Sequence, residues 1–299
     1  LSLHDALPIL LTLIISASVK GGRRWIDLGF INFQPAELAK LFLFIHLAAL
    51  IESKGEEIKK YKEGFRYALL WILFTCGLIF AQPNVSNASL LLLISMIVLY
   101  VGGARFIHIF FSLVISGIVS ISIAMLFSHS RGRIMNFVES LMNGGHINSQ
   151  VKQALYGLGS GGIWGVGFGH SSQRNLFLPE AYGDFIFAIL GEERGFVGAT
   201  FVLLIYLGVF IAGIIIAKNA KDKFGQVLGI AISLSFITYA LVNIAVASGL
   251  IPTTGLPLPF ISYGGTSLII MSISIGILIN IGVSNIKENL PPQIETAEI

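Results

Sequence analysis

Long apolar runs separated by shorter polar segments dominate this chain. A helix that crosses the ~30 Å hydrocarbon core of a bilayer needs about 20 mainly apolar residues, and about eight runs approach that length. These runs are residues 1–19, 36–52, 67–82, 88–104, 106–128, 196–217, 225–250 and 260–283. The pattern predicts an all-α, polytopic protein with a single integral membrane domain over residues 1–299. The third and fourth runs are short, and the segment from Gln82 to Asn87 is expected to lengthen them at the interface.

Composition supports a membrane protein and excludes several other classes. Hydrophobic residues make up 55% of the chain and charged residues 12%, and the mean hydropathy of +0.83 lies outside the range of soluble domains. The net charge of +3 comes without a basic patch interleaved with aromatic residues, so the sequence does not predict nucleic-acid binding. A single cysteine, Cys76, excludes an internal disulfide and a cysteine-based metal cluster.

The distribution of cations predicts the orientation of the chain in the membrane. Short loops rich in Lys and Arg stay cytoplasmic, and the loop from Glu52 to Arg66 carries five such residues. Parity then places Arg105 and the cluster from Lys218 to Lys223 on the same side. The outer segments become 20–34, 82–87, 129–183 and 251–259. Cations in these segments, such as Arg23, Arg24, Arg131, Arg133, Lys152 and Arg174, need another explanation.

The outer loop over residues 129–183 is long for a connection without structure, and such loops are usually functional or disordered. It is not of low complexity. A helix is predicted from Ser149 to Leu158, followed by a glycine-rich run from Gly157 to Gly169. Closely spaced glycines let a backbone approach a ligand, and exposed N–H groups could cradle a phosphate. A flexible re-entrant segment is an equally good interpretation of the same composition.

Directly after this loop, the segment 178–195 sets four carboxylates within apolar sequence, namely Glu180, Asp184, Glu192 and Glu193. Ionisable groups at such a border are a functional-site hypothesis, because unpaired charge in lipid costs several kcal/mol. The alternative for Asp184 is that it caps a helix opening at Phe185. Glu192 and Glu193 indicate a break between a half-helix and a full span, with Arg194 or another cation as their partner.

Five ordered motifs give the chain a resemblance to the SEDS family (shape, elongation, division and sporulation), of the RodA/FtsW type. The motifs are Gly21-Gly-Arg-Arg-Trp-Ile26, Phe33-Gln-Pro-Ala-Glu-Leu-Ala-Lys40, Gly159-Ser-Gly-Gly162, Leu178-Pro-Glu-Ala-Tyr-Gly-Asp-Phe-Ile-Phe187 with Gly191-Glu-Glu193, and Pro252-Thr-Thr-Gly-Leu-Pro-Leu-Pro-Phe-Ile-Ser-Tyr-Gly-Gly265. The last of these favours the division type over the elongation type. The family has ten spanning helices with cytoplasmic termini, which implies an N-terminally truncated chain that starts at Leu1 without the first two.

The resemblance implies a bacterial cytoplasmic membrane enzyme that polymerises lipid II, a disaccharide pentapeptide on a lipid diphosphate, at the outer face. A class B penicillin-binding transpeptidase is the implied partner. In this reaction a sugar hydroxyl attacks an anomeric carbon with inversion, so a carboxylate base is needed. The diphosphate leaves without an acid if cations or a metal stabilise it. Mg or Mn would serve, but no ligand cluster specifies a metal site, and no other cofactor is implied.

The resemblance also implies roles for individual residues. Asp184 matches the catalytic base. Lys40 follows a helix start at Pro35 and is a candidate to bind the diphosphate, with an ion pair to Glu37 as the structural alternative. The full set of substrate-binding candidates is Arg23, Arg24, Trp25, Lys40, Gln150, Gln153, Glu180 and Ser262.

The chain departs from the family pattern at three positions, and two other functions are alternatives to polymerisation. Asn84 stands where the family usually has Asp, while Tyr182 and Gly183 replace residues common beside the base. A lipid II flippase or other transporter would need ionisable groups near the midplane and related halves with broken helices, and no internal repeat is visible. A non-catalytic scaffold for a transpeptidase is the third interpretation.

Overall fold

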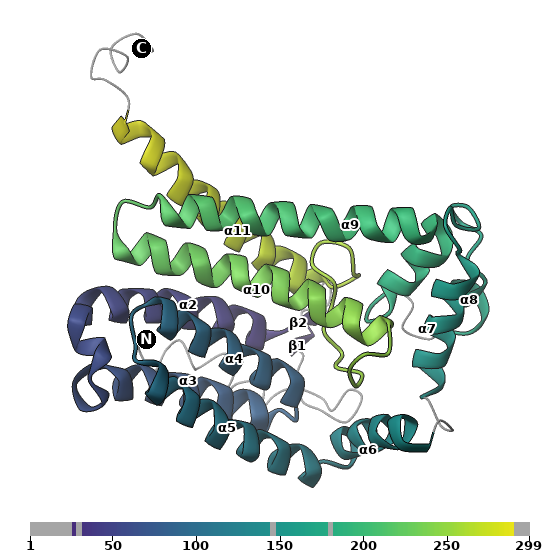
Figure 1. Cartoon of the computed structure of the whole chain (residues 1–299), viewed down its shortest axis with the longest axis horizontal. Coiled ribbons are helices and arrows are strands. Elements are labelled where there is room, and N and C mark those ends of the chain that lie inside the picture. Colours follow the sequence, from purple (N-terminus) through teal and green to yellow (C-terminus); the bar gives the residue numbers. More distant parts are fainter. Residues whose placement is uncertain (1–25, 28–31, 144–147, 179–181, 290–299) are drawn as a thin grey trace.

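The computed structural model describes residues 26–27, 32–143, 148–178 and 182–289 of the chain. Helices form nearly all of the described structure, and one antiparallel pair of two-residue strands precedes them (Figure 1). The elements are β1 (Ile26–Asp27), β2 (Asn32–Phe33), α2 (Pro35–Lys54), η1 (Gly55–Lys59), η2 (Tyr61–Phe65), α3 (Arg66–Ala81), α4 (Val85–Val101), α5 (Phe106–Leu126), α6 (Ser128–Asn143), α7 (Ser149–Ser160), α8 (Ser172–Leu176), α9 (Ile186–Lys218), α10 (Lys223–Ala247) and α11 (Gly265–Asn289).

The described helices confirm a membrane protein but correct the number of spans. Five are long and apolar enough to cross a bilayer, and they lie at 61–81, 106–126, 186–218, 223–247 and 265–284. The helix Val85–Val101 is apolar but shorter. Helix α2 has 20 residues but carries Glu37, Lys40 and Glu52, and the expected first span falls outside the described residues. The prediction of about eight spans is therefore not reproduced in this part of the chain.

The lengthening of the third run was also predicted at the wrong end. The π-helical turn Tyr61–Phe65 continues into α3, so the apolar helix extends to 21 residues on the side of Tyr61. The segment after Gln82 instead turns sharply, with the Gln82 backbone N–H donating to the Ile79 carbonyl oxygen (3.1 Å).

The long helices lie alongside one another, with α10 in the middle of the bundle (Figure 1). Most of α10 is buried against α2, α4, α9 and α11, whereas α5 and α9 expose most of their apolar side chains. An exposed apolar surface of this kind fits a lipid solvent, because no water has to be kept away from it.

The basic loops meet at one end of the bundle, as the charge distribution predicted. The backbone N–H of Phe224, at the start of α10, donates to Glu52 Oε1 at the end of α2 (3.2 Å). A β-carbon on Gly103, in the turn before Arg105, would lie 3.7 Å from Ile58 of η1. Loops that are far apart in sequence thus share the end predicted to be cytoplasmic.

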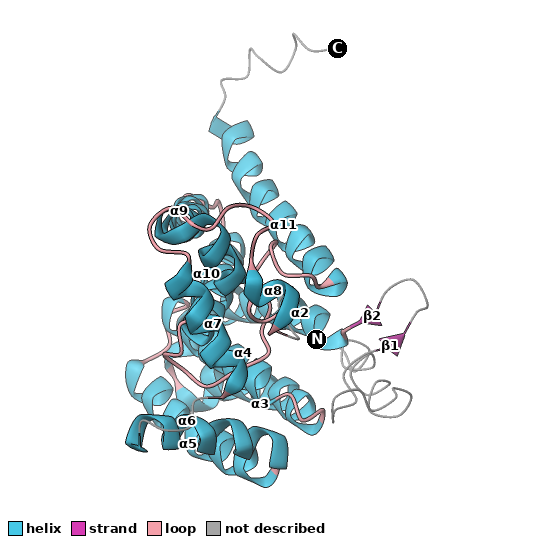
Figure 2. Ribbon diagram, turned by 90° about the vertical axis from the view of Figure 1, so that its right-hand side faces the viewer, coloured by secondary structure: helices cyan, strands magenta, loops and turns pink. Residues whose placement is uncertain are grey.

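The opposite end carries the outer loop, which is largely helical. Helix α7 crosses the ends of α9 and α10, with α8 beside it (Figure 2). The predicted helix from Ser149 to Leu158 is confirmed as α7. Helix α6, which continues from α5, was not predicted.

Candidate functional site

Asp184 lies in a turn just ahead of α9 and does not cap it. The N-cap of α9 is Phe185, and no side chain makes a capping hydrogen bond there. The alternative of a capping role for Asp184 is therefore wrong. Asp184 is half-buried, at the end of the bundle opposite the basic loops.

Three hydrogen bonds hold the main chain of this turn. Asn243 Nδ2 of α10 donates to the Asp184 carbonyl oxygen (3.0 Å), and Ser262 Oγ donates to that of Gly183 (2.7 Å). The Tyr263 N–H donates to the carbonyl oxygen of Tyr182 (2.8 Å). The backbone on both sides of the carboxylate is thereby fixed, which is what a positioned base requires.

The same groups bind the segment 251–262 to the bundle. Asn243 Nδ2 also donates to Leu256 O (2.8 Å), and Ser262 Oγ accepts from Leu258 N–H (2.7 Å). Tyr206 of α9 donates from its hydroxyl to Pro259 O (2.6 Å). The structure thus gives Ser262, a candidate for substrate binding, a buried role in positioning the turn of Asp184.

A cation that the sequence left unexplained lies beside Asp184. A β-carbon placed on Gly255 would lie 3.6 Å from Asp184 Oδ2 and 3.7 Å from Arg133 Nη1. Both charged groups therefore converge on the exposed face of Gly255. The φ of +76° at Gly255 favours glycine as well, so a side chain is disfavoured both by conformation and by the two groups it would meet.

Arg133 reaches this place from α6. Its Nη1 donates to Thr253 O (3.2 Å), across 120 residues of sequence. Burial lowers the pKa of Arg133, and the nearby Asp184 carboxylate opposes this effect by raising it. The one available sequence signal was that Arg133 stood in a predicted outer loop, where the charge rule offered no reason for it.

Lys40 is buried, and its ion pair with Glu37 is formed as the structural alternative predicted. The Nζ–Oε2 distance is 2.7 Å, and 5% of Lys40 and 1% of Glu37 are exposed. Asn87 Nδ2 of α4 donates to Glu37 Oε1 (3.3 Å), and Tyr239 of α10 donates to Asn87 Oδ1. The Lys40 ammonium also lies 4.0 Å from the centre of the Tyr239 ring, a favourable cation–π position.

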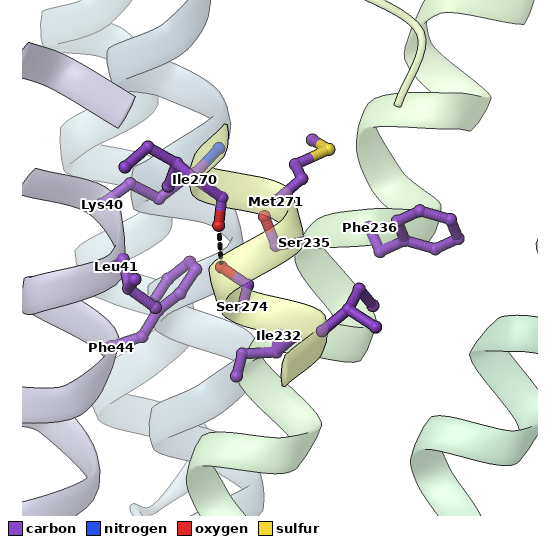
Figure 3. A pocket seen from close by; sticks show the side chains of 10 residues that line it. Lys40, Leu41, Phe44, Ile232, Ser235, Phe236, Ile270, Met271 and Ser274 are labelled. Carbon is purple, nitrogen blue, oxygen red and sulfur yellow. Dashed lines mark hydrogen bonds between the residues drawn. The ribbon is translucent and has the colours of Figure 1, made fainter. Parts of the chain in front are cut away.

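Helix α10 connects this cluster to Asp184. Tyr239, which contacts Lys40, and Asn243, which holds the Asp184 carbonyl, are four residues apart and so share one face of α10. Lys40 thus lies about one helical turn deeper than the Asp184 turn, roughly 6 Å along α10. Lys40 also borders a narrow apolar pocket between α2, α10 and α11, where Phe44 faces Ile270 and Ser274 (Figure 3).

Glu192 is satisfied by the protein itself. Its carboxylate accepts from the Ser171 hydroxyl and from the N–H groups of Ser172 (3.1 Å) and Gln173 (3.3 Å), all around the start of α8. Only 2% of Glu192 is exposed. These contacts indicate a role in holding α8 against α9.

Glu193 pairs with Arg174 and not with Arg194. The Arg174 Nη1–Glu193 Oε1 distance is 3.0 Å, while the Arg194 guanidinium lies over the Phe168 ring at 5.3 Å. The predicted break follows directly, because Gly195 departs from helical geometry with φ 67° and ψ −168°. The interpretation of this segment as a half-helix followed by a full span is confirmed.

The glycine-rich run packs against this break, so its close backbone approach is to α9. The N–H groups of Val166 and Gly167 donate to the carbonyls of Glu192 (3.0 Å) and Glu193 (3.2 Å). In return, the N–H groups of Phe196 and Val197 donate to Gly162 and Ile163. The backbone groups that the break leaves unpaired are thereby satisfied, as burial in a membrane demands. This use of the glycines replaces the interpretation as a phosphate cradle.

The remaining candidates are only partly placed. Gln150 and Gln153 lie half-buried on α7, whose buried face packs on α9. Arg23, Arg24, Trp25 and Glu180 lie outside the described residues. Within the described residues, no three His, Cys, Asp or Glu side chains are grouped so that they could hold a metal ion.

Comparison with known proteins identifies relatives over almost the whole chain. The model of the cell cycle protein family of FtsW, RodA and SpoVE matches residues 3–287. The chain is 38% identical over 286 residues to the probable peptidoglycan glycosyltransferase FtsW of Escherichia coli O6:H1, covering 93% of this chain and 68% of FtsW. It is 36% identical over 264 residues to stage V sporulation protein E of Bacillus subtilis, covering 87% of this chain and 71% of that protein.

Solved structures show the same fold. A chain from a peptidoglycan synthase complex, solved to explain the structural coordination of polymerization and crosslinking, aligns with a TM-score of 0.76 at 25% identity. That alignment covers 94% of this chain and 79% of the other. The rod shape determining protein RodA of Thermus thermophilus aligns with a TM-score of 0.64 at 26% identity, covering 92% of this chain and 75% of RodA.

Proposed function

Because the chain belongs to the SEDS family of FtsW, RodA and SpoVE and is FtsW-like, we propose that it is a peptidoglycan glycosyltransferase that polymerises lipid II with Asp184 as general base. The observation that carries the proposal is the arrangement around Asp184. A half-buried carboxylate, its backbone fixed on both sides, faces a guanidinium across an exposed glycine at the outer end of the bundle.

The proposed reaction needs one proton acceptor and one site of positive charge. The oxygen of an acceptor sugar hydroxyl attacks the anomeric carbon of a lipid-linked donor, and Asp184 takes the hydroxyl proton. The bond from that carbon to the diphosphate oxygen breaks, and the diphosphate leaves with the electron pair. Arg133 stabilises the negative charge that develops there, because a guanidinium binds phosphate oxygens in a bidentate way.

Lys40 supports this site from one turn deeper. Its ammonium is already neutralised by Glu37, so it contributes less free positive charge than Arg133 does. We assign it to orienting the lower wall of the site through Tyr239, which shares a face of α10 with Asn243. Arg23 and Arg24 remain proposed binding residues for the diphosphate. The proposed steps use only positive charges that protein side chains supply.

The depth of the charged groups favours polymerisation over transport. Lys40 follows Pro35 by five residues, which places it about 7 Å into its helix. The break at Gly195 leaves roughly 35 Å of helix to Lys218, enough for a full span below the break. Ionisable groups and the broken helix thus lie near the outer border, whereas a transporter would place them at the midplane.

Likeness to the chain of a peptidoglycan synthase complex supports a partner of the class B penicillin-binding transpeptidase type. Similarity to bacterial FtsW supports a place in the bacterial cytoplasmic membrane, and the distribution of Lys and Arg supports an outward position of the Asp184 end. Similarity to FtsW supports a role in cell division.

The test is polymerisation of purified lipid II by the Asp184→Asn variant in membranes. We expect product to fall at least a thousandfold, while the variant inserts and melts like the wild type. A folded variant that still polymerises would refute Asp184 as the base. If the wild-type protein does not polymerise lipid II but supports a transpeptidase, the scaffold interpretation holds. If the wild type and the Asp184→Asn variant both move lipid II across vesicle membranes, transport is favoured.

A further inference from the structure

A second pocket lies beside Arg133, which is the one lining residue that the proposed chemistry uses. It has a volume of about 170 Å³ and lies between α6, the start of α7 and the segment 249–253. Arg133 lines it while also facing Asp184 across Gly255. A ligand in this pocket would therefore lie beside Arg133, with the Arg133 side chain between it and the Asp184 turn.

The size of the pocket limits what it holds. About 170 Å³ is close to the ~150 Å³ of an engineered protein cavity that binds benzene, which is the scale of one six-membered ring. It is too small for a disaccharide with its peptide. The pocket is suited to one ring of a larger substrate, with the rest outside.

The wall combines neutral polar groups with apolar side chains, which are Phe137, Val151, Leu155, Ile251 and Pro252. Asn136 and Ser140 line it from α6, and Asn148, the N-cap of α7, lines it from the opposite side of the loop. The Ser140 hydroxyl donates to Phe137 O (2.7 Å), which leaves its lone pairs as acceptors. Asn148 Oδ1 accepts from Gln150 N–H (2.9 Å), which leaves its Nδ2 group as a donor. Phe137 adds an apolar face.

Charge argues against a diphosphate in this pocket. Arg133 is the one cation among its described lining residues, and its guanidinium already faces Thr253 O and the Asp184 carboxylate. Arg133 is also the group assigned to the leaving diphosphate on the Asp184 side, so a diphosphate inside this pocket would need positive groups besides Arg133. A neutral ring with hydroxyl and acetamido groups instead matches the amides, the hydroxyl and the apolar side chains of the wall.

We propose that this pocket, defined by Asn136, Phe137, Ser140 and Asn148, is the subsite for the N-acetylated acceptor sugar whose hydroxyl Asp184 deprotonates. The proposal rests on the proposed polymerase function. Phe137 packs on the apolar face of the ring, and Asn136 and Asn148 bind its polar substituents. Arg133, at the shared wall, lies between this ring and the diphosphate whose charge it stabilises.

The experiment uses the full chain in membranes and two soluble probes of matched size. Diacetylchitobiose carries acetamido groups, and cellobiose has the same linkage without them. We expect diacetylchitobiose to inhibit lipid II polymerisation competitively and cellobiose to inhibit about tenfold less well, a difference of the size of one or two hydrogen bonds. Equal inhibition by the two sugars, or none by either, would overturn the proposal.

Variants on α6 localise the effect. Asn136→Ala and Phe137→Leu should each raise the KM for lipid II and weaken inhibition by diacetylchitobiose about tenfold, with kcat nearly retained. Glu139→Gln, exposed on the same helix and outside the pocket, is the matched control. Unchanged KM and inhibition in both pocket variants would exclude the subsite and leave the polymerase assignment standing.

A binding readout separates this proposal from the function on which it rests. Diacetylchitobiose should raise the melting temperature of the Asp184→Asn variant, and adding Asn136→Ala should remove that shift. If Asp184→Asn polymerises normally, the base assignment fails whatever the sugar does. If Asp184→Asn is inactive but the sugar shifts its melting equally with and without Asn136→Ala, the subsite alone fails.

Discussion

Asp184 and the pair Glu192 and Glu193 lie within ten residues of sequence, but their carboxylates have opposite surroundings in the fold. Glu192 and Glu193 are buried, with 2% and 6% exposed, and their oxygens bind Ser171, two backbone N–H groups and Arg174. Asp184 is half-buried, and the fold holds its backbone while its carboxylate faces Arg133 at an exposed glycine. A buried acid with partners on all sides stabilises structure, whereas a fixed but accessible acid is available for proton transfer.

The largest effect on stability is expected when Glu192 is removed. Glu192→Ala leaves the Ser171 hydroxyl and the N–H groups of Ser172 and Gln173 without their buried acceptor, which costs about 3–4 kcal/mol. Thermal unfolding in detergent measures the loss. Glu56→Ala is the control, because the side chain of Glu56 is 86% exposed and its ion pair with Lys59 contributes less than about 1 kcal/mol. Equal losses in the two variants would contradict a structural role for Glu192.

The next largest effect is expected on the rate of lipid II polymerisation. Arg133→Ala removes the guanidinium beside Asp184 and should lower kcat for lipid II about hundredfold, the usual cost of one group that stabilises developing charge. Its melting temperature should change little. Arg131→Ala, on the exposed side of the same helix, should polymerise normally. An Arg133→Ala variant with wild-type kcat would show that the pairing with Asp184 has no part in the reaction.

Two glycines at the C-terminal end of α7, Gly159 in its last turn and Gly161 at its C-cap, test how the buried carboxylates are held. A β-carbon on Gly161 would lie 2.1 Å from the Gly191 carbonyl oxygen of α9, so Gly161→Ala should destabilise the protein by about 2 kcal/mol. Gly159 has open space around it, so Gly159→Ala should be neutral or stabilise α7 by up to about 1 kcal/mol. Chemical denaturation distinguishes them. Similar behaviour of the two variants would mean that α7 does not pack closely on α9.

The smallest effect concerns the support of Asp184. Ser262→Ala removes hydrogen bonds to Gly183 O and from Leu258 N–H, which should cost about 1 kcal/mol of stability and lower kcat severalfold. Ser272→Ala on exposed α11 is the control, since Ser272 bonds only the preceding turn of its own helix. An increase in KM with unchanged kcat would point to direct substrate contact instead of positioning.

Much of the fold followed from hydrophobic patterning. Apolar runs located α3, α4, α5, α10 and α11, and the Pro35–Glu37 sequence located the start of α2, because such signals are local. The paired acids before Gly195 correctly indicated a broken helix. Helix α6 was missed because its apolar positions are too sparse for the pattern to stand out from a polar loop.

The site followed from the sequence less completely. A motif identified Asp184, but nothing in the sequence identified Arg133 as its neighbour. Arg133 is held there by its hydrogen bond to Thr253 O, 120 residues away, and no local pattern encodes that contact. The glycine run illustrates the same limit. Its composition was compatible with a phosphate cradle or with a flexible re-entrant segment, and neither interpretation included the observed packing against the backbone of Glu192 and Glu193.

The most direct measurement compares Asp184→Asn with Glu192→Gln for lipid II polymerisation, expressed per folded molecule after melting curves are recorded. Asp184→Asn should fold like the wild type and lose at least a thousandfold in rate. Glu192→Gln should lose stability, while the molecules that remain folded polymerise near the normal rate. Polymerisation by folded Asp184→Asn, or its loss in fully folded Glu192→Gln, would contradict the assignment of chemistry to one acid and structure to the other.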